Sequence, residues 1–174
     1  YRDAQTPVVN ALKFSGHAVD YVTEKRLREG RLEKYDYDFI VMPSCNYISD
    51  DTFNRVGEYV KGGGRAIVVG ELPEKGPMWE TRDLDWLKTP EKTDPLYAGA
   101  TNGLSFACGK GRVWIMPKSD EKTLQRDLEA ISEGIVPVRP VVMEDVEYRS
   151  IPWTNDKGEK VYLTYVINEW TGAD

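Results

Sequence analysis

The chain has 174 residues, of which 40% are hydrophobic and 30% are charged, a composition typical of a soluble globular domain of ordinary size. Its net charge of −6 argues against a nucleic-acid partner, because phosphate binding needs clustered Lys and Arg side chains. The sequence has no apolar run as long as a membrane span and no signal-peptide core, which leaves a cytoplasmic or a secreted location open.

The two cysteines, Cys45 and Cys108, are too few and too far apart for a disulfide framework or a zinc site. We therefore expect neither a metal nor a cofactor. Position 1 is Tyr rather than Met, so we expect the chain to be a piece of a longer protein.

The first part of the chain predicts two helices with a strand between them. Thr6 is a good cap for a first helix, which Gly16 ends. Residues 17–22 are rich in strand formers and predict a strand. Thr23 then caps a short charged helix that ends at Gly30.

The clearest pattern is a strand–helix–strand unit over residues 35–71. Two apolar runs, at 39–42 and 66–69, predict parallel strands on either side of an amphipathic helix. Ser49 caps that helix, and the glycines at 62–64 stop it. Because the run at 39–42 is apolar at every position, we expect a central strand covered on both faces.

The 72–102 segment holds four prolines and has no regular pattern, which is typical of loops that bind a ligand or mediate assembly. Two short runs, at 104–107 and 112–116, then predict a hairpin. Ser119 caps a further helix that Gly134 ends.

After this helix the pattern changes. The alternating stretches at 146–151 and 160–168 predict an antiparallel pair rather than another strand–helix repeat. We place a boundary near 134–142. We therefore expect an α/β domain over 1–134, and a linker with an antiparallel β appendage over 135–174 that begins a C-terminal β-domain.

Four stretches, in their order and spacing, resemble the middle domain of family 42 β-galactosidases, often called the trimerisation domain. These stretches are ALKFSGHAVDYVTEKRLREGRL at 11–32, YDYDFIVMPSCNYISDDTF at 35–53, VGEYVKGGGRAIVVGE at 56–71 and GKGRVWIMP at 109–117. The resemblance implies a flavodoxin-like, class I amidotransferase-like fold, that is, a doubly wound α/β domain with a mostly parallel sheet. The first strand of such a fold is missing here. In that family a catalytic barrel precedes the domain and a small β-domain follows it.

Amidotransferases of this fold group hold a nucleophilic Cys in the turn after the strand that corresponds to residues 66–69. Here that turn reads Gly70-Glu71-Leu72 and offers no Cys, Ser or Thr for acyl transfer. Cys45 follows the preceding strand, and the single histidine, His17, is its only candidate base. We expect His17 at the opposite end of its strand. We therefore interpret Cys45 as a structural thiol, with a cysteine-dependent amidase as the alternative.

Two further patterns are interpreted as structural. Asn168-Glu169 at a strand end matches the placement of the acid/base Glu in barrel glycosidases, but a barrel needs about 250 residues. The glycines at 62–64 end a helix, whereas a phosphate-binding loop opens one.

The candidate ligand site consists of polar side chains that follow predicted strands. The carboxyl ends of parallel strands meet at one sheet edge, where open α/β folds bind ligands. We expect five residues at this edge: Glu24, Ser44, Cys45, Asn46 and Glu71.

Two tryptophans of the 72–102 segment, Trp79 and Trp86, are the candidate exposed aromatics. Aromatic faces stack on the apolar CH patches of sugar rings, and they also serve cores and subunit interfaces. Trp114 lies inside a predicted strand, and we assign it to the core.

Two functions are consistent with these observations. The first is a non-catalytic accessory or assembly domain of a bacterial, β-galactosidase-like glycoside hydrolase. Its partners would be further copies, other domains of the parent chain and a carbohydrate. The second is a stand-alone protein of the same fold that binds or hydrolyses a small molecule or sugar at the sheet edge.

Overall fold

The structure is a computed structural model that describes residues 2–15, 17, 19–35, 37–133, 146–154, 157–158 and 160–168. The chain forms two compact units. The first unit comprises Tyr1–Gln5 and Tyr21–Ser119, and the second comprises Thr6–Asp20 and Asp120–Asp174.

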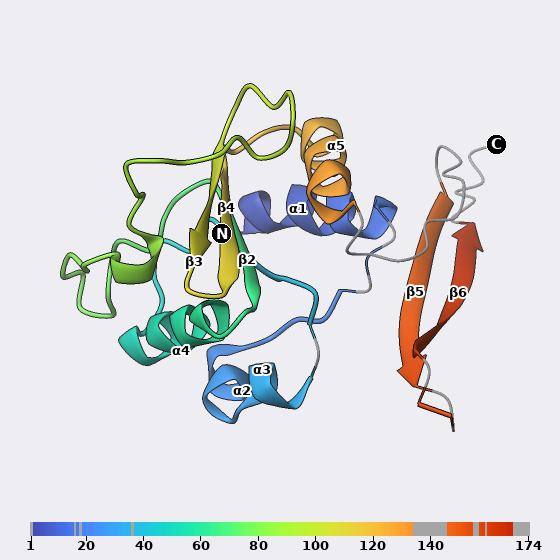
Figure 1. Ribbon diagram of the computed structural model, residues 1–174, viewed down its shortest axis with the longest axis horizontal. Coiled ribbons are helices and arrows are strands. Elements are labelled where there is room, and N and C mark those ends of the chain that lie inside the picture. Colours follow the sequence, from blue (N-terminus) through green and yellow to red (C-terminus); the bar gives the residue numbers. More distant parts are fainter. Residues whose placement is uncertain are drawn as a thin grey trace. The chain divides into compact units, whose positions relative to one another are not determined.

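The first unit contains a four-stranded sheet with the order β1-β2-β4-β3. Figure 1 labels β2, β3 and β4 of this sheet. The parallel part consists of β1 (Ile40–Pro43), β2 (Arg65–Val69) and β4 (Gly111–Met116). Strand β3 (Leu104–Cys108) pairs antiparallel with β4. The predictions of a mixed α/β fold, a mostly parallel sheet and a β3–β4 hairpin are therefore confirmed.

Strand β1 lies at an edge of this sheet, so the expectation of a central strand covered on both faces is wrong. Met42 is the only buried residue of β1, whereas β2, the neighbour between β1 and β4, is buried from Ala66 to Val69. An apolar run alone does not tell whether a second neighbour exists, because the neighbour comes from elsewhere in the chain.

The expected strand at 17–22 is also absent, since residues 17 and 19–22 are irregular. A strand forms only where a neighbouring backbone completes its hydrogen bonds. Here the side chain of Tyr21 is 65% exposed, while Val22 packs against the core and leads the chain into a helix.

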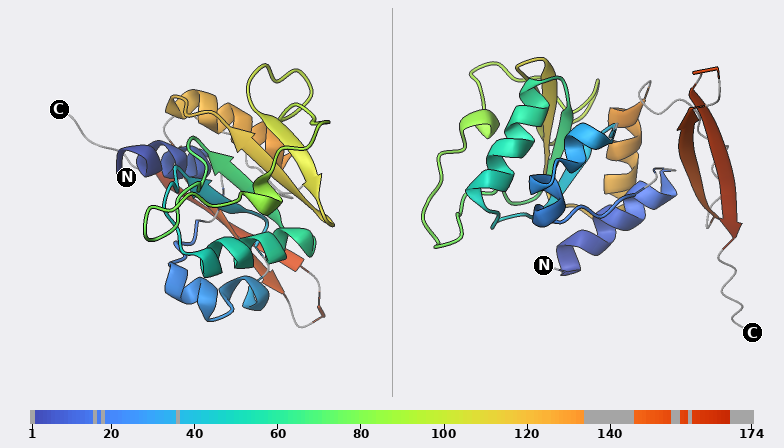
Figure 2. Two further views of the ribbon diagram at one scale, coloured as in Figure 1. Left: turned by 90° about the vertical axis from the view of Figure 1, so that its left-hand side faces the viewer. Right: turned by 90° about the horizontal axis from the view of Figure 1, so that it is seen from below.

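Helix α4 (Asp50–Lys61) packs against β2 and β4. As predicted, Ser49 caps it by accepting a hydrogen bond from the backbone N–H of Thr52, and Gly62 is its C-cap. The apolar side chains at 53, 56 and 60 are buried, and each such burial contributes about 1.5–3 kcal/mol. Figure 2 shows two short helices, α2 (Glu24–Arg28) and α3 (Arg31–Lys34), next to α4.

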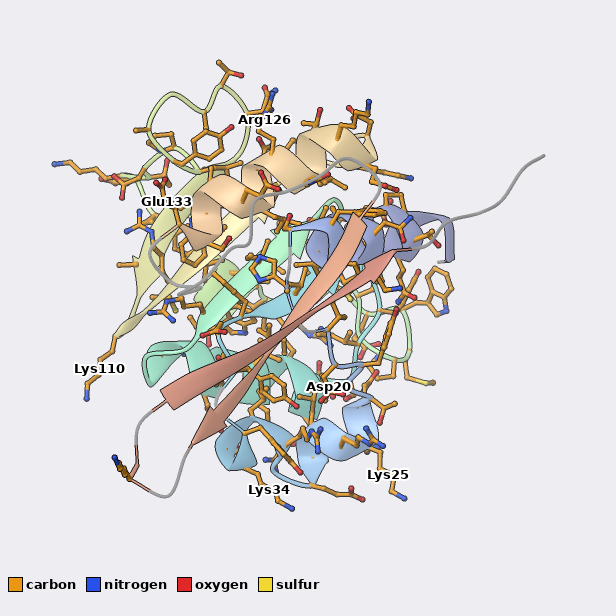
Figure 3. All side chains as sticks on the ribbon, turned by 90° about the vertical axis from the view of Figure 1, so that its right-hand side faces the viewer. Asp20, Lys25, Lys34, Lys110, Arg126 and Glu133 are labelled. Carbon is orange, nitrogen blue, oxygen red and sulfur yellow. The ribbon has the colours of Figure 1, made fainter. Side chains whose placement is uncertain are left out.

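The core of the first unit joins α4 to the sheet and to the two short helices. Its buried residues are Leu27, Leu32, Met42, Ile48, Phe53, Val56, Val60, Ala66, Val68, Trp86, Leu87, Phe106 and Val113. The turn between β3 and β4 adds a backbone contact, because the N–H of Lys110 donates to the carbonyl of Lys61 over 2.9 Å. The side chain of Lys110 projects away from the ribbon (Figure 3).

The second unit contains most of α1 (Arg2–Phe14) and all of α5 (Glu121–Ser132). The side-chain amide of Asn10 donates to the Glu121 carboxylate over 2.9 Å and joins these helices. Helix α1 begins before the expected cap at Thr6, so Pro7 lies inside the helix.

Helix α5 begins one residue later than expected. Asp120 rather than Ser119 is its N-cap, because the Asp120 carboxylate accepts hydrogen bonds from both the N–H and the hydroxyl of Thr123. These bonds hold the pKa of Asp120 below its ordinary value.

The predicted antiparallel pair is confirmed as β5 (Val146–Thr154) and β6 (Lys160–Asn168), and β5 is longer than expected. Asn168 ends β6, as predicted. Four expectations lie outside the described residues: the helix ends at Gly16 and Gly134, the boundary at 134–142, and Glu169. Within the described ranges, no helix is long and apolar enough to cross a membrane.

Candidate functional site

The carboxyl ends of β1 and β2 meet at one edge of the sheet, as predicted. The backbone N–H of Ser44 donates to the carbonyl of Val69 over 2.7 Å, and the N–H of Gly70 donates to the carbonyl of Met116 over 2.9 Å. These bonds bring the turns after β1, β2 and β4 together. Glu71 follows Gly70 directly and is exposed.

Gly70 opens the turn in which the sequence resemblance led us to look for an amidotransferase nucleophile. Its φ is +82°, which few residues other than glycine adopt. A Cβ atom at Gly70 would lie 2.6 Å from the hydroxyl oxygen of Ser44, so the turn has no room for a side chain unless Ser44 moves. A side chain at this position would therefore need a strained backbone and a shift of Ser44.

Residues 44–46 form hydrogen bonds with backbone groups in and beside the turn after β1. The hydroxyl of Ser44 donates to the carbonyl of Val69 over 3.5 Å, and the thiol of Cys45 donates to the carbonyl of Pro43 over 3.7 Å. The carbonyl of Asn46 accepts a hydrogen bond from the N–H of Lys75 over 3.3 Å. Ser44 has a φ of +44°, so this turn holds a strained residue.

Glu24 supports the start of α4. Its carboxylate accepts hydrogen bonds from the N–H and hydroxyl of Ser49, over 3.2 and 2.5 Å, and from the hydroxyl of Thr52 over 3.0 Å. Burial by itself raises the pKa of Glu24, but these bonds and the charge of Arg28 outweigh it and hold the pKa below its ordinary value. The carboxylate thus stabilises a helix N-terminus rather than pointing to a ligand.

The structure separates the two candidate tryptophans. Trp86 is 4% exposed, so the expectation that it is exposed is wrong: its indole N–H donates to the carbonyl of Phe53 over 3.0 Å. Trp79 is 69% exposed, as expected, and its ring lies 4.5 Å from that of Tyr47, centroid to centroid. Trp114 is buried, as predicted.

Two residues that join the 72–102 segment to the rest of the first unit were not predicted from the sequence. Arg82 ties the 72–102 segment to the start of α4. The side chain of Arg82 is 6% exposed. Its guanidinium group donates hydrogen bonds to the carbonyls of Ile48 and Pro73 and to the carboxylate of Asp50. Tyr47 contacts Trp79 and pairs with Lys75 in an isolated parallel bridge. No local pattern marks either residue, because their partners come from distant parts of the sequence.

An open groove of about 340 Å³ lies beside Arg82 and Asp50. Four of its eight lining residues are acidic, and the lining comprises Asp50, Phe53, Asn54, Glu80, Thr81, Arg82, Asp83 and Asp85. Among the residues that the structure describes, no group of His, Cys, Asp and Glu is arranged to hold a metal ion. Cys45 and Cys108 are thiols rather than partners in a disulfide, and burial raises the pKa of Cys108 despite the nearby charge of Lys61.

Comparison with known proteins gives matches among solved structures only. No family model and no curated protein sequence matches the chain. A catalytic mutant of Gan42B, a GH42 β-galactosidase from G. stearothermophilus, is similar with a TM-score of 0.64 and 13% identity over 97% of this chain. The cold-adapted β-galactosidase from Rahnella sp. R3 has a TM-score of 0.68 and 15% identity over 86% of this chain.

A GH42 exo-carrageenase from Bacteroides ovatus is similar with a TM-score of 0.57 and 18% identity over 95% of this chain. The chain spans 35%, 30% and 20% of the length of these three relatives, respectively. At these identities the likeness shows the fold. The chain has the fold of one part of larger GH42 proteins.

Proposed function

We propose that this chain is a non-catalytic assembly domain of a bacterial, β-galactosidase-like glycoside hydrolase, equivalent to the middle or trimerisation domain of family 42. The observation that carries the proposal is the extent of the likeness. It covers nearly all of this chain but only about a third of the β-galactosidase from G. stearothermophilus. This proportion is what a single domain of a multidomain enzyme would have.

The turn after β2 supports the non-catalytic part of the proposal. An amidotransferase needs an activated nucleophile, and the turn Gly70-Glu71-Leu72 supplies no Cys, Ser or Thr. Of the other polar groups expected at this edge, Glu24 is held at the start of α4, and the Ser44 hydroxyl and Cys45 thiol donate to backbone carbonyls. These contacts give three of the five side chains expected at the edge a structural role.

Two measurements on the purified chain test the proposal. Light scattering after size exclusion, over about 10–500 µM, is expected to show a mass that rises with concentration towards a small oligomer. Assays with 4-nitrophenyl β-galactoside are expected to show no turnover above buffer. A monomer at every concentration would contradict the assembly role.

The stand-alone alternative gives the opposite result in the second assay. Turnover by the isolated chain that the Ser44→Ala or Glu71→Gln variant abolishes would overturn the non-catalytic role and place chemistry at the sheet edge. Loss of such turnover in Cys45→Ser alone would instead favour a cysteine-dependent hydrolase.

A further inference from the structure

The tip of the 72–102 segment presents an aromatic surface to solvent. Trp79 is 69% exposed, Met78 is 86% exposed and Tyr47 is 41% exposed. The rings of Tyr47 and Trp79 meet edge to face, with centroids 4.5 Å apart and planes inclined by 65°. Because Trp79 stays largely exposed, most of its ring surface is open to a partner.

Local hydrogen bonds hold this tip in shape. The N–H of Gly76 donates to the carbonyl of Glu80 over 3.0 Å, and the N–H of Trp79 donates to the carbonyl of Gly76 over 3.1 Å. The carboxylate of Glu80 accepts from the N–H of Met78 over 2.8 Å. Lys75 closes the base of the tip by pairing with Thr81, and its ammonium group donates to the Thr81 hydroxyl over 3.0 Å.

Trp79 is fixed in a strained backbone conformation. Its φ of +65° lies in the left-handed region that residues with a Cβ atom rarely adopt. Local strain of this kind persists only where the surrounding structure imposes it, and it is concentrated at functional sites. Burial gives no reason for the conformation here, because the ring faces solvent.

The size and chemistry of the surface favour a sugar ring over a protein. The patch consists of three side chains, whereas a stable protein interface takes roughly 20–30 residues from each partner. An open indole face matches the flat CH face of one pyranose ring. The same tip carries the ammonium group of Lys75, the carboxylate of Glu80 and the hydroxyl of Thr81. Towards sugar hydroxyls the ammonium can donate hydrogen bonds, the carboxylate can accept them, and the Thr81 hydroxyl can do both.

We propose that the Tyr47–Trp79 pair is a carbohydrate-binding subsite that stacks one pyranose ring of a neutral sugar on the indole of Trp79. Tyr47 positions the indole, and the polar side chains of the tip contact hydroxyls at the ring's edge. This inference rests on the geometry of the tip and does not depend on the assembly role.

Titration of the ¹⁵N-labelled chain with lactose and galactose tests the subsite through the indole N–H signals. The Trp79 signal is assigned by its absence in Trp79→Phe. It is expected to shift saturably with a Kd on the order of 1 mM, while the signal of buried Trp86 stays in place. Sorbitol, an open-chain polyol without a flat ring face, is the ligand control and is expected to leave the Trp79 signal unchanged.

Variants separate stacking from general effects. Trp79→Ala is expected to raise the Kd at least about tenfold, and Trp79→Phe, which keeps an aromatic face, about threefold. For variants without the indole, the backbone N–H signals of residues 75–81 report binding. Tyr21→Ala removes an equally exposed aromatic elsewhere in the first unit and is the matched control, with an unchanged Kd.

Two results would overturn the subsite. The first is no shift of the Trp79 signal at about 50 mM lactose or galactose, well above the expected Kd, or an equal shift with sorbitol. The second is a lower mass of Trp79→Ala than of the wild type in light scattering, together with a wild-type Trp79 signal that no sugar shifts. That result would make the tip a contact between protein chains. Turnover assays and the mass of the wild type test the assembly role separately.

Discussion

Trp79 and Trp86 lie seven positions apart in one irregular segment, and the structure uses them in opposite ways. Trp86 is buried against Phe53 and Gly57 and anchors the segment to α4. Trp79 is held at a strained, exposed tip. The segment therefore contains two contrasting regions: an anchor at residues 82–87 that stabilises the fold, and a tip at residues 75–81 that the fold presents to solvent.

The largest effect is expected at the centre of the anchor. Trp86→Ala removes a buried indole and its hydrogen bond to the Phe53 carbonyl, and is expected to lower the free energy of unfolding by about 3–5 kcal/mol. Urea denaturation followed by circular dichroism measures the loss. Trp86→Phe keeps the ring packing and should lose less. A change below about 1 kcal/mol for Trp86→Ala would show that the anchor does not bear on stability.

Arg82 tests whether the anchor depends on polar contacts as well. Arg82→Met keeps the bulk of the stem but leaves the carbonyls of Ile48 and Pro73 without this donor. The expected loss in the free energy of unfolding is about 2–4 kcal/mol, again by urea denaturation. Arg82→Lys keeps the charge without the guanidinium fork and should fall in between. Equal stability of Arg82→Met and the wild type would contradict the anchor.

Glu24 tests the N-terminus of α4, on which the anchor rests. Glu24→Gln removes the charge that accepts three hydrogen bonds, and is expected to cost about 1–2 kcal/mol of unfolding free energy at pH 7. Because the folded pKa of Glu24 lies below the ordinary 4.5, its stabilisation is present above pH 4.5 and is lost as pH falls through the folded pKa.

The difference between wild type and Glu24→Gln should accordingly be constant near neutral pH and shrink in more acidic buffer. Glu29→Gln, at an exposed position near the end of the same short helix, is the matched control and should leave stability nearly unchanged. A difference that grows as the pH falls below 4.5 would contradict the inferred hydrogen-bonded carboxylate.

The smallest effect on stability is expected at the tip. Trp79→Gly removes an exposed side chain and relieves a positive φ, so the free energy of unfolding is expected to stay within about 1 kcal/mol of the wild type. Thermal denaturation checks this result. A loss comparable to that of Trp86→Ala would erase the distinction between tip and anchor and would mean that Trp79 supports the fold.

Much of the first unit could be predicted from the sequence because its signals are local. Ser49 and Gly62 mark the ends of α4 by their own capping chemistry, and the apolar run that became β2 lies between glycines. The absence of a nucleophile at Gly70-Glu71-Leu72 is also a property of the sequence itself. These features depend on neighbours within a few residues.

The tertiary structure alone decided which residues meet across long separations. It made β1 an edge strand, placed Glu24 against Ser49, and buried Trp86 while exposing Trp79. The 72–102 segment, with its four prolines, has no regular pattern that could mark Arg82, and Tyr47 gains its role only through the distant Lys75 and Trp79. The hydrogen bonds of Arg82 reach a partner 34 positions away, and only the folded chain brings the two residues together.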